Sequence, residues 1–244
     1  NELKISHEAR ASPLSQDTKV QEMLEKARAE SKPEWEVAEQ VVRIPLEQLK
    51  PFKNHPFKVR DDDDLMQDTI DSIMAGRDVM CIMPTGAGKS VCYQITALMQ
   101  SGTTLVVSPL ISLMKDQVSA LSQMDIKAAY INSSMTSQEY GRTLSAMSRG
   151  LYRIVYVAPE RLHSETFAEI CREIDIPFIA VDEAHCISQW GQDFRPSYLR
   201  IAEFVRELPG RPVIGAFTAT ATPDVKEDIK TLLELDDPFC ITTS

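Results

Sequence analysis

Residues 83 to 90 read Met-Pro-Thr-Gly-Ala-Gly-Lys-Ser, and they follow the apolar run Val79–Ile82. A buried strand that leads into a Gly-rich loop ending in Lys-Ser is typical of a phosphate-binding loop. The glycines let backbone N–H groups point at phosphate oxygens, the lysine charge suits β- and γ-phosphates, and the serine hydroxyl suits Mg²⁺. We therefore expect an ATP and Mg²⁺ site formed by Thr85, Gly86, Ala87, Gly88, Lys89 and Ser90.

Two interpretations of this loop stay open: the phosphate-binding loop and an ordinary turn between a strand and a helix. Met83 stands where the strict phosphate-loop pattern has its first glycine. An ordinary strand–turn–helix with two turn glycines would also fit the letters. The segment Val91–Met99 is expected to be helical, which would add a favourable helix dipole at the phosphates.

A second acidic motif follows another apolar run. Phe178–Val181 leads directly into Asp182-Glu183-Ala184-His185. A carboxylate at the end of a buried strand can hold Mg²⁺ while its neighbour orients an attacking water. Asp182 suits the first role and Glu183 the second, so we expect both, with Lys89, to be catalytic. A solvated acidic turn is the simpler alternative, but two phosphate-chemistry motifs at strand ends favour the catalytic interpretation.

The segment after the acidic motif is rich in aromatic and polar residues. Trp190 and Phe194 lie among Gln, Gly, Asp and Arg with little apolar company. Exposed aromatic rings can stack on unpaired bases, at roughly 1–3 kcal/mol per base, and Arg195 can neutralise phosphate or stack on a base. The alternative is that Trp190 caps the core and Phe194 fills a gap in it.

Taken together, Met83–Ser90, the box Asp182–His185 and Thr218-Ala219-Thr220 resemble a superfamily 2 helicase. Three further segments resemble RecQ DNA helicases, and the first of them resembles the family's aromatic-rich loop: Cys186–Tyr198, Ser108–Gln117 and Tyr156–Leu162. The resemblance implies ATP-dependent DNA unwinding in DNA repair and recombination, with single-stranded or partly unwound DNA as partner. It also implies DNA contact or coupling to the ATP site for His185, Gln189, Trp190, Phe194, Arg195, Thr218 and Thr220.

Composition and charge restrict the class of protein. The 244 residues are 43% hydrophobic and carry a net charge of −10, which argues against a basic surface that coats duplex DNA. The five cysteines show no metal-binding spacing, so neither a zinc site nor a disulfide framework is indicated. No apolar run is long enough to span a membrane, and no signal-peptide pattern is visible. We therefore expect no membrane partner and a location in the bacterial cytoplasm or nucleoid.

Short apolar runs alternate with helix-like stretches from residue 73 onward. This alternation predicts a parallel α/β sheet, and the resemblance implies its RecA-like version, with helices on both faces, over residues 73–244. The seven expected strands are Val79–Met83, Leu105–Val107, Ala128–Ile131, Ile154–Val157, Phe178–Val181, Val213–Phe217 and Phe239–Thr242. Helices are expected at Ser112–Met124, Ser137–Ser148 and Tyr198–Leu208. A further helix is expected to begin at Pro223, with Thr222 as its N-cap.

The first part of the chain has a different character. Residues 1–40 are polar and are expected to form a disordered or helical extension. Residues 41–72 resemble the opening of a ParB-type N-terminal domain, a small α/β fragment with a strand, a Pro-rich turn and a helix. In this region Arg60 and Gln67 do not match the aromatic-Arg-x-x-Gln motif with which RecQ proteins read adenine. How the chain would recognise adenine is therefore open.

The residues thus favour the first motor lobe of a RecQ-type, ATP-dependent DNA helicase. The resemblance places the arginine finger in a second lobe, so the 244-residue chain is expected to be incomplete and weakly active, with 3′–5′ unwinding only when a second lobe is present. The alternative function is a ParB-like DNA-binding partition protein with a vestigial ATP lobe. The sequence does not indicate the oligomeric state.

Overall fold

The computed structural model describes residues 63–191 and 193–242. The predicted extension over residues 1–40 and most of the ParB-like fragment, residues 41–62, lie outside the described residues. The remainder of that fragment belongs to helix α2 (Asp63–Met74). Carboxylates at the first positions of a helix favour its dipole, which agrees with an Asp-rich start.

All described strands belong to one parallel sheet of seven strands, in the order β3-β4-β2-β5-β6-β1-β7. The expected apolar runs all form strands, and the fold class is confirmed. Their bounds are β1 (Val79–Ile82), β2 (Thr104–Val107), β3 (Ala128–Ile131), β4 (Ile154–Val157), β5 (Phe178–Val181), β6 (Val213–Thr218) and β7 (Phe239–Thr242).

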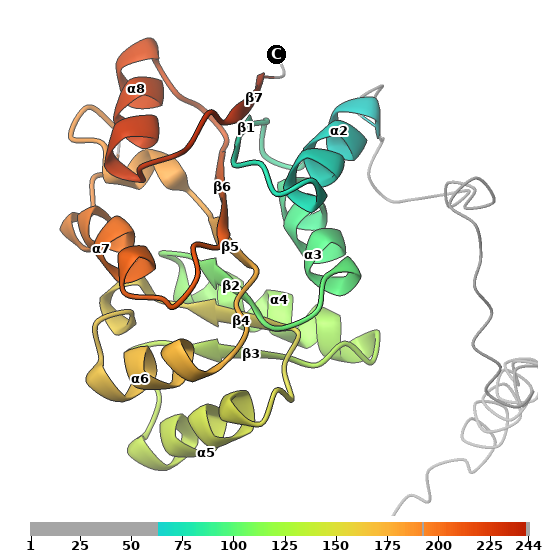
Figure 1. The fold of residues 1–244 in the computed structure, drawn as a ribbon, viewed down its shortest axis with the longest axis vertical. Helices are drawn as coiled ribbons and strands as arrows, with labels where there is room; N and C mark the ends of the chain where they lie inside the picture. Colours follow the sequence, from blue (N-terminus) through green and yellow to red (C-terminus); the bar gives the residue numbers. More distant parts are fainter. Residues whose placement is uncertain (1–62, 192, 243–244) are drawn as a thin grey trace, which may run out of the picture. The chain divides into compact units, whose positions relative to one another are not determined.

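Helices cover both faces of the sheet (Figure 1). The helices α2, α3 (Lys89–Met99) and α4 (Ile111–Gln123) contribute to the apolar cluster on one face. The other face is covered by α5 (Ser137–Ser148), α6 (Glu165–Glu173), α7 (Ile201–Arg206) and α8 (Pro223–Leu232). Short 3-10 helices lie at Pro159–Arg161, Ala184–Ile187 and Pro196–Arg200.

Alternation along the strands explains the two layers of core. In β1, Met80 packs into the cluster on one face, whereas Val79 and Cys81 pack into the cluster on the other. Successive side chains of a strand point to opposite faces, so a strand covered on both faces must be apolar throughout. This is why the strands appear in the sequence as short continuous apolar runs.

The entry to β1 is secured by a buried carboxylate. The Asp78 side chain accepts hydrogen bonds from the backbone N–H groups of Ile214 and Asp236, each at 2.8 Å. Arg211 pairs with the same carboxylate at 2.5 and 3.1 Å. Asp78 therefore joins the starts of β1 and β6 at the edge of the sheet where strands enter.

The cysteines are free thiols, four of them buried and Cys240 exposed. Within residues 63–191 and 193–242, every helix is too short or too polar to cross a membrane.

Candidate nucleotide site and aromatic loop

The loop after β1 turns through two glycines with a left-handed backbone. Gly86 and Gly88 have φ angles of 87° and 94°, in the region that only glycine enters freely. A Cβ atom on Gly88 would also lie 2.6 Å from the Met66 sulfur of α2, so this methionine side chain packs directly against the glycine. Gly88 caps α3, and its carbonyl accepts from the N–H groups of Val91 and Cys92.

Lys89 is the first residue of α3 and is half-buried. Its ammonium group donates to the carbonyls of Met83 and Pro84, at 2.8 and 3.1 Å. The lysine is therefore folded over the loop, with its charge held at the place where phosphate oxygens would lie. Ser90 is half-buried beside it, whereas Thr85 and Gly86 are exposed at the turn.

The acidic motif follows β5 at the same edge of the sheet. Asp182 is 5% exposed, and its carboxylate lies 3.5 Å from the Ser108 hydroxyl. Burial, together with the adjacent Glu183 charge, raises the pKa of Asp182 to about 6. The positive charge of Lys89 opposes this rise in the Asp182 pKa.

Glu183 has an unusual backbone for a residue other than glycine, with φ 47° and ψ 45°. Non-glycine residues in this left-handed region cost on the order of 1–2 kcal/mol. The chain therefore turns directly after Asp182, where β5 has ended and the 3-10 helix Ala184–Ile187 begins. A hydrogen bond from His185 holds the pKa of Glu183 below its usual range, so this carboxylate is charged at neutral pH.

His185 connects the acidic motif to the end of β6. Its Nδ1 atom lies 2.8 Å from the Thr218 hydroxyl and 3.3 Å from the Glu183 carboxylate. The Thr218 hydroxyl donates to the Thr220 carbonyl at 3.2 Å, so it accepts from Nδ1, which must carry a proton. Contacts with the Cys186 thiol and with Glu183 raise the pKa of His185 to about 10.

The three motifs meet because their strands are neighbours. The order β5-β6-β1 places the ends of these strands side by side, and the Met83 N–H donates to the Thr218 carbonyl at 3.0 Å. Thr218 is buried and Thr220 is exposed. Parallel sheets bind ligands at the edge where strands end, which is the edge formed here.

The aromatic segment leaves this edge as a tight turn. A Cβ atom on Gly191 would lie 2.5 Å from the His185 carbonyl, so the turn can close only with glycine. Ser188 is buried, and its hydroxyl donates to Asp228 of α8 at 2.6 Å while accepting from the Trp190 N–H at 3.1 Å. The buried Ser188 therefore ties the turn to α8, whereas the Trp190 side chain is exposed to solvent.

The exposure of the aromatic residues distinguishes the two interpretations of this loop. Trp190 is 77% exposed, so the interpretation that it caps the core is wrong. Gln189 is exposed and Phe194 is half-buried. Arg195 pairs with Asp193 at 2.9 Å and donates to the Pro109 carbonyl at 3.0 Å. Its charge is therefore partly balanced within the loop.

Sequence reasoning missed a buried connection between the loop and the acidic motif. The Tyr198 side chain is fully buried, and its hydroxyl donates to the Asp182 carbonyl at 2.9 Å. Tyr198 lies sixteen residues after Asp182. No local periodicity predicts such a contact. Ser108, which faces the Asp182 carboxylate, was likewise noted only as part of a resemblance.

Gln67 lies in the region where the RecQ pattern has its adenine-reading glutamine. The Gln67 side chain is exposed and donates to the Asp71 carboxylate of its own helix at 2.8 Å. Met66, the residue before it, is the one that packs against the phosphate loop. Gln67 is therefore turned to its own helix and away from the loop.

The residues fit a nucleotide with Mg²⁺. Among residues 63–191 and 193–242, no group of three or more His, Cys, Asp or Glu residues is arranged to enclose a metal ion. Mg²⁺ needs no such cage, because it is usually held by one or two carboxylates, waters and the phosphates themselves. A buried carboxylate, a serine hydroxyl and a glycine cradle are hard-oxygen and N–H groups of the kind this ligand requires.

A seven-stranded parallel sheet with a phosphate loop after β1 and an acidic pair after β5 defines a RecA-like phosphate-loop lobe. Residues 64–229 match the model of the DEAD/DEAH box helicase family. The chain therefore belongs to the DEAD/DEAH box helicase family.

The chain is similar in sequence to RecQ helicases of several bacteria. The ATP-dependent DNA helicase RecQ of Bacillus subtilis is 59% identical over 155 residues, which cover 64% of this chain and 26% of that protein. RecQ of Pasteurella multocida is 44% identical over 172 residues, covering 70% of this chain and 27% of that protein. The chain thus spans about a quarter of the length of these relatives.

Solved structures agree in fold at low identity. The DUF1998 helicase MrfA bound to DNA has a TM-score of 0.58 at 19% identity, over 73% of this chain and 27% of that one. A hypothetical ATP-dependent RNA helicase from Sulfolobus tokodaii has a TM-score of 0.57 at 21% identity, over 76% and 54%. At these identities the likeness concerns the fold alone.

Proposed function

We propose that this lobe binds Mg²⁺–ATP and hydrolyses it as the first motor lobe of a RecQ-type DNA helicase. The observation that carries the proposal is the meeting of Lys89, Asp182 and Glu183 at one edge of the sheet. Burial raises the pKa of Asp182 to about 6, whereas the hydrogen bond from His185 lowers the pKa of Glu183. A cation and two carboxylates with opposed pKa shifts at one strand edge suit phosphoryl transfer to water.

The roles follow from the geometry of each side chain. Lys89 would exchange its two carbonyl contacts for phosphate oxygens, and backbone N–H groups from Gly86 to Ser90 would surround the phosphates. Ser90 and Asp182 would hold Mg²⁺, which supplies charge neutralisation when bound. The charged Glu183 would accept a hydrogen bond from the attacking water and so orient it, while His185 fixes its carboxylate.

For the DNA partner, we propose single-stranded or partly unwound DNA at the aromatic loop. The exposed Trp190 offers a face for base stacking, and Phe194 offers part of a second one. The chain Glu183–His185–Thr218–Thr220 would link the nucleotide to the end of β6, next to this loop. Unwinding in the 3′–5′ direction would require a second lobe. A cytoplasmic or nucleoid location is part of the same proposal.

The alternative, a ParB-like partition protein with a vestigial ATP lobe, depends on residues 41–72. The described lobe gives it no support, because the phosphate loop keeps its glycines, its lysine and its acidic partner. The two functions differ in nucleotide binding, which a vestigial lobe would lack.

A thermal-shift titration tests the proposal. Mg²⁺–ADP at about a hundredfold above its Kd should stabilise the chain by about 2.7 kcal/mol. Lys89→Ala should abolish most of this shift, whereas Lys230→Ala, a lysine on α8, should retain it. An equal shift in the Lys89 variant would remove this lysine from the site, and no shift in the natural chain would favour the vestigial lobe.

A further inference from the structure

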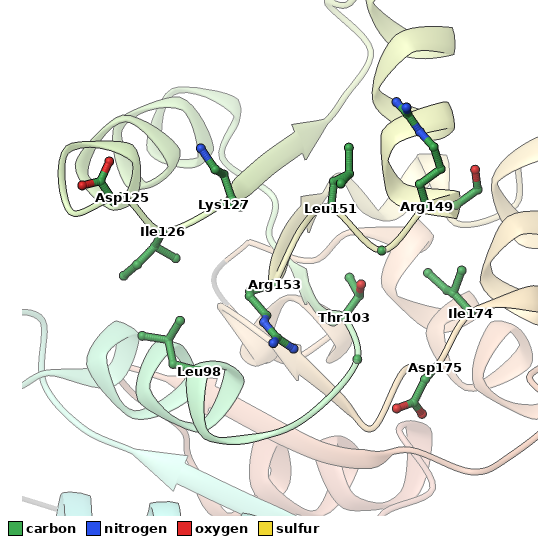
Figure 2. A pocket seen from close by; sticks show the side chains of 13 residues that line it. Leu98, Thr103, Asp125, Ile126, Lys127, Arg149, Leu151, Arg153, Ile174 and Asp175 are labelled. Carbon is green, nitrogen blue, oxygen red and sulfur yellow. The ribbon is translucent and has the colours of Figure 1, made fainter. Parts of the chain in front are cut away.

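A cavity lies at the edge of the sheet opposite the phosphate loop. It has a volume of ≈ 600 Å³ and is lined by the end of α3, by segments 102–103, 125–127, 148–151 and 174–175, and by Arg153 (Figure 2). These segments enter β2, β3, β4 and β5. Because all strands are parallel, their entry ends form the edge away from the nucleotide site. The volume is in the range of sites that bind small ligands or peptide side chains.

The end of α4 builds one side of the cavity. Asp125 has φ 59°, and its N–H donates to the Ser122 carbonyl at 3.2 Å. The Ile126 N–H donates to the Leu121 carbonyl at 3.0 Å. This pair of bonds is a Schellman motif, which ends the helix and turns the next residues away from its axis. It places Asp125, Ile126 and Lys127 in the cavity wall.

The end of α5 builds the other side with the same motif. Gly150 has φ 67°, and its N–H donates to the Met147 carbonyl at 2.9 Å. The Leu151 N–H donates to the Ala146 carbonyl at 3.2 Å. Arg149 and Leu151, on either side of the glycine, consequently lie at the cavity. Two separate helix ends therefore present a cation and an apolar side chain each.

Three cations line this cavity in a chain whose net charge is −10. Lys127, Arg149 and Arg153 are all exposed, and within the described part of the chain none of them forms an ion pair. Figure 2 shows Arg153 between Leu98 and Thr103. Cations without carboxylate partners are available to a ligand that carries negative charge.

Apolar side chains are concentrated around the same cavity. Leu98 and Leu151 line it and are 45% and 51% exposed. Ile126 and Ile174 also line it and are half-buried. Leu98 and Leu151 are two of the ten large hydrophobic side chains that the described part of the chain exposes. Clustering of this kind, unlike scattered exposure, is typical of an interaction site.

We propose that the cavity is a docking site for an acidic peptide segment of a partner protein, with an apolar side chain that enters between Leu98 and Leu151. The charges of Lys127, Arg149 and Arg153 complement such a segment. Nucleic acid fits less well, because none of the residues that line the cavity is aromatic.

The probe is a fluorescein-labelled peptide in which glutamate alternates with leucine, titrated with the 244-residue chain by anisotropy. Arg149→Gln with Arg153→Gln should weaken binding about tenfold, since each exposed ion pair contributes roughly 0.2–1 kcal/mol. Arg142→Gln, an exposed arginine of α5 outside the cavity, should leave binding unchanged. The version of the peptide with lysine in place of glutamate should not bind.

Asp125→Gly gives a test in the opposite direction. Glycine suits the positive φ at this position, so the fold should be retained, and the thermal midpoint checks this. Loss of a carboxylate from the wall should then strengthen binding of the glutamate peptide. Absence of binding to the natural chain, or affinity unaffected by the double arginine variant, would overturn the proposal. Displacement of the peptide by a single-stranded oligonucleotide that depends on the same arginines would instead assign the cavity to nucleic acid.

Discussion

Replacing Tyr198 with phenylalanine should weaken both the stability of the lobe and its response to nucleotide. The Tyr198 hydroxyl is buried and donates to the Asp182 carbonyl at 2.9 Å. The change removes one donor and leaves a buried carbonyl with a lost partner, which costs about 1–3 kcal/mol. For a lobe of this size, each kcal/mol lowers the thermal midpoint by roughly 2–4 °C.

The functional part of this prediction rests on the position of the bond. Tyr198 belongs to the segment that carries the aromatic loop, and Asp182 is the proposed Mg²⁺ ligand. The hydroxyl therefore fixes the peptide from which Asp182 and Glu183 project, which makes Tyr198 a positioning residue. We expect the Mg²⁺–ADP affinity to fall in the phenylalanine variant, and stimulation of ATP turnover by single-stranded DNA to fall further.

Urea unfolding and nucleotide thermal shifts measure the two effects separately. Tyr152→Phe is the matched control, because the Tyr152 hydroxyl forms no hydrogen bond within residues 63–191 and 193–242, and the residue is half-buried. The control should be neutral in both measurements. Unchanged stability in the Tyr198 variant would refute the bond itself, and lost stability with an unchanged nucleotide response would reduce Tyr198 to a structural role.

Three further outcomes follow from the site and the core. Trp190→Ala should leave the unfolding free energy within about 0.5 kcal/mol of the natural chain, because the side chain is 77% exposed, and should weaken single-strand binding in a fluorescence titration; a large loss of stability would restore the core interpretation. The pKa of Asp182 is raised from 3.8 to about 6, so protonation should reduce the Mg²⁺-dependent part of the nucleotide shift as the pH falls below about 6. In the same range the contribution of this group to the stability of the unliganded lobe should rise, since the folded state binds the proton more tightly than the unfolded one; the shift at pH 7.5 and at pH 5.5 provides the comparison. Asp78→Ala should cost about 2–5 kcal/mol in urea unfolding, because it leaves the backbone N–H groups of Ile214 and Asp236 without their acceptor, at about 1–3 kcal/mol each. Arg211→Ala should also lower the unfolding free energy, because it leaves the buried Asp78 carboxylate without its cation.

Local patterns were sufficient for the elements of the fold. The apolar runs predicted the described strands because the strands at the centre of the sheet are buried on both faces, as the two core clusters show. Helix α5 begins and ends where its pattern predicted, since Thr136 and Glu139 form a capping box at its start. The N-cap at Thr222 was also confirmed, with its hydroxyl accepting from the Val225 N–H. Capping depends on residues three apart, which a sequence displays directly.

Contacts between distant segments lay beyond that reasoning. Whether Trp190 was core or exposed could not be decided from its neighbours, because a polar loop can fold over a core or away from it. The bonds of Ser188 to Asp228 and of Arg195 to Pro109 join segments 40 and 86 residues apart. They exist only because the parallel sheet brings the ends of its strands to one edge.

The sequence by itself determined the class of the lobe and the groups proposed to face phosphate, because glycine, lysine and paired carboxylates at strand ends have few other uses in combination. Only the tertiary structure decided how those groups are held. The order β5-β6-β1 made neighbours of motifs separated by up to 135 residues, from Met83 to Thr218. Burial then raised the pKa of Asp182, and a tyrosine sixteen residues later fixed its peptide. Such effects depend on distance and on the removal of water, which are properties of the folded chain.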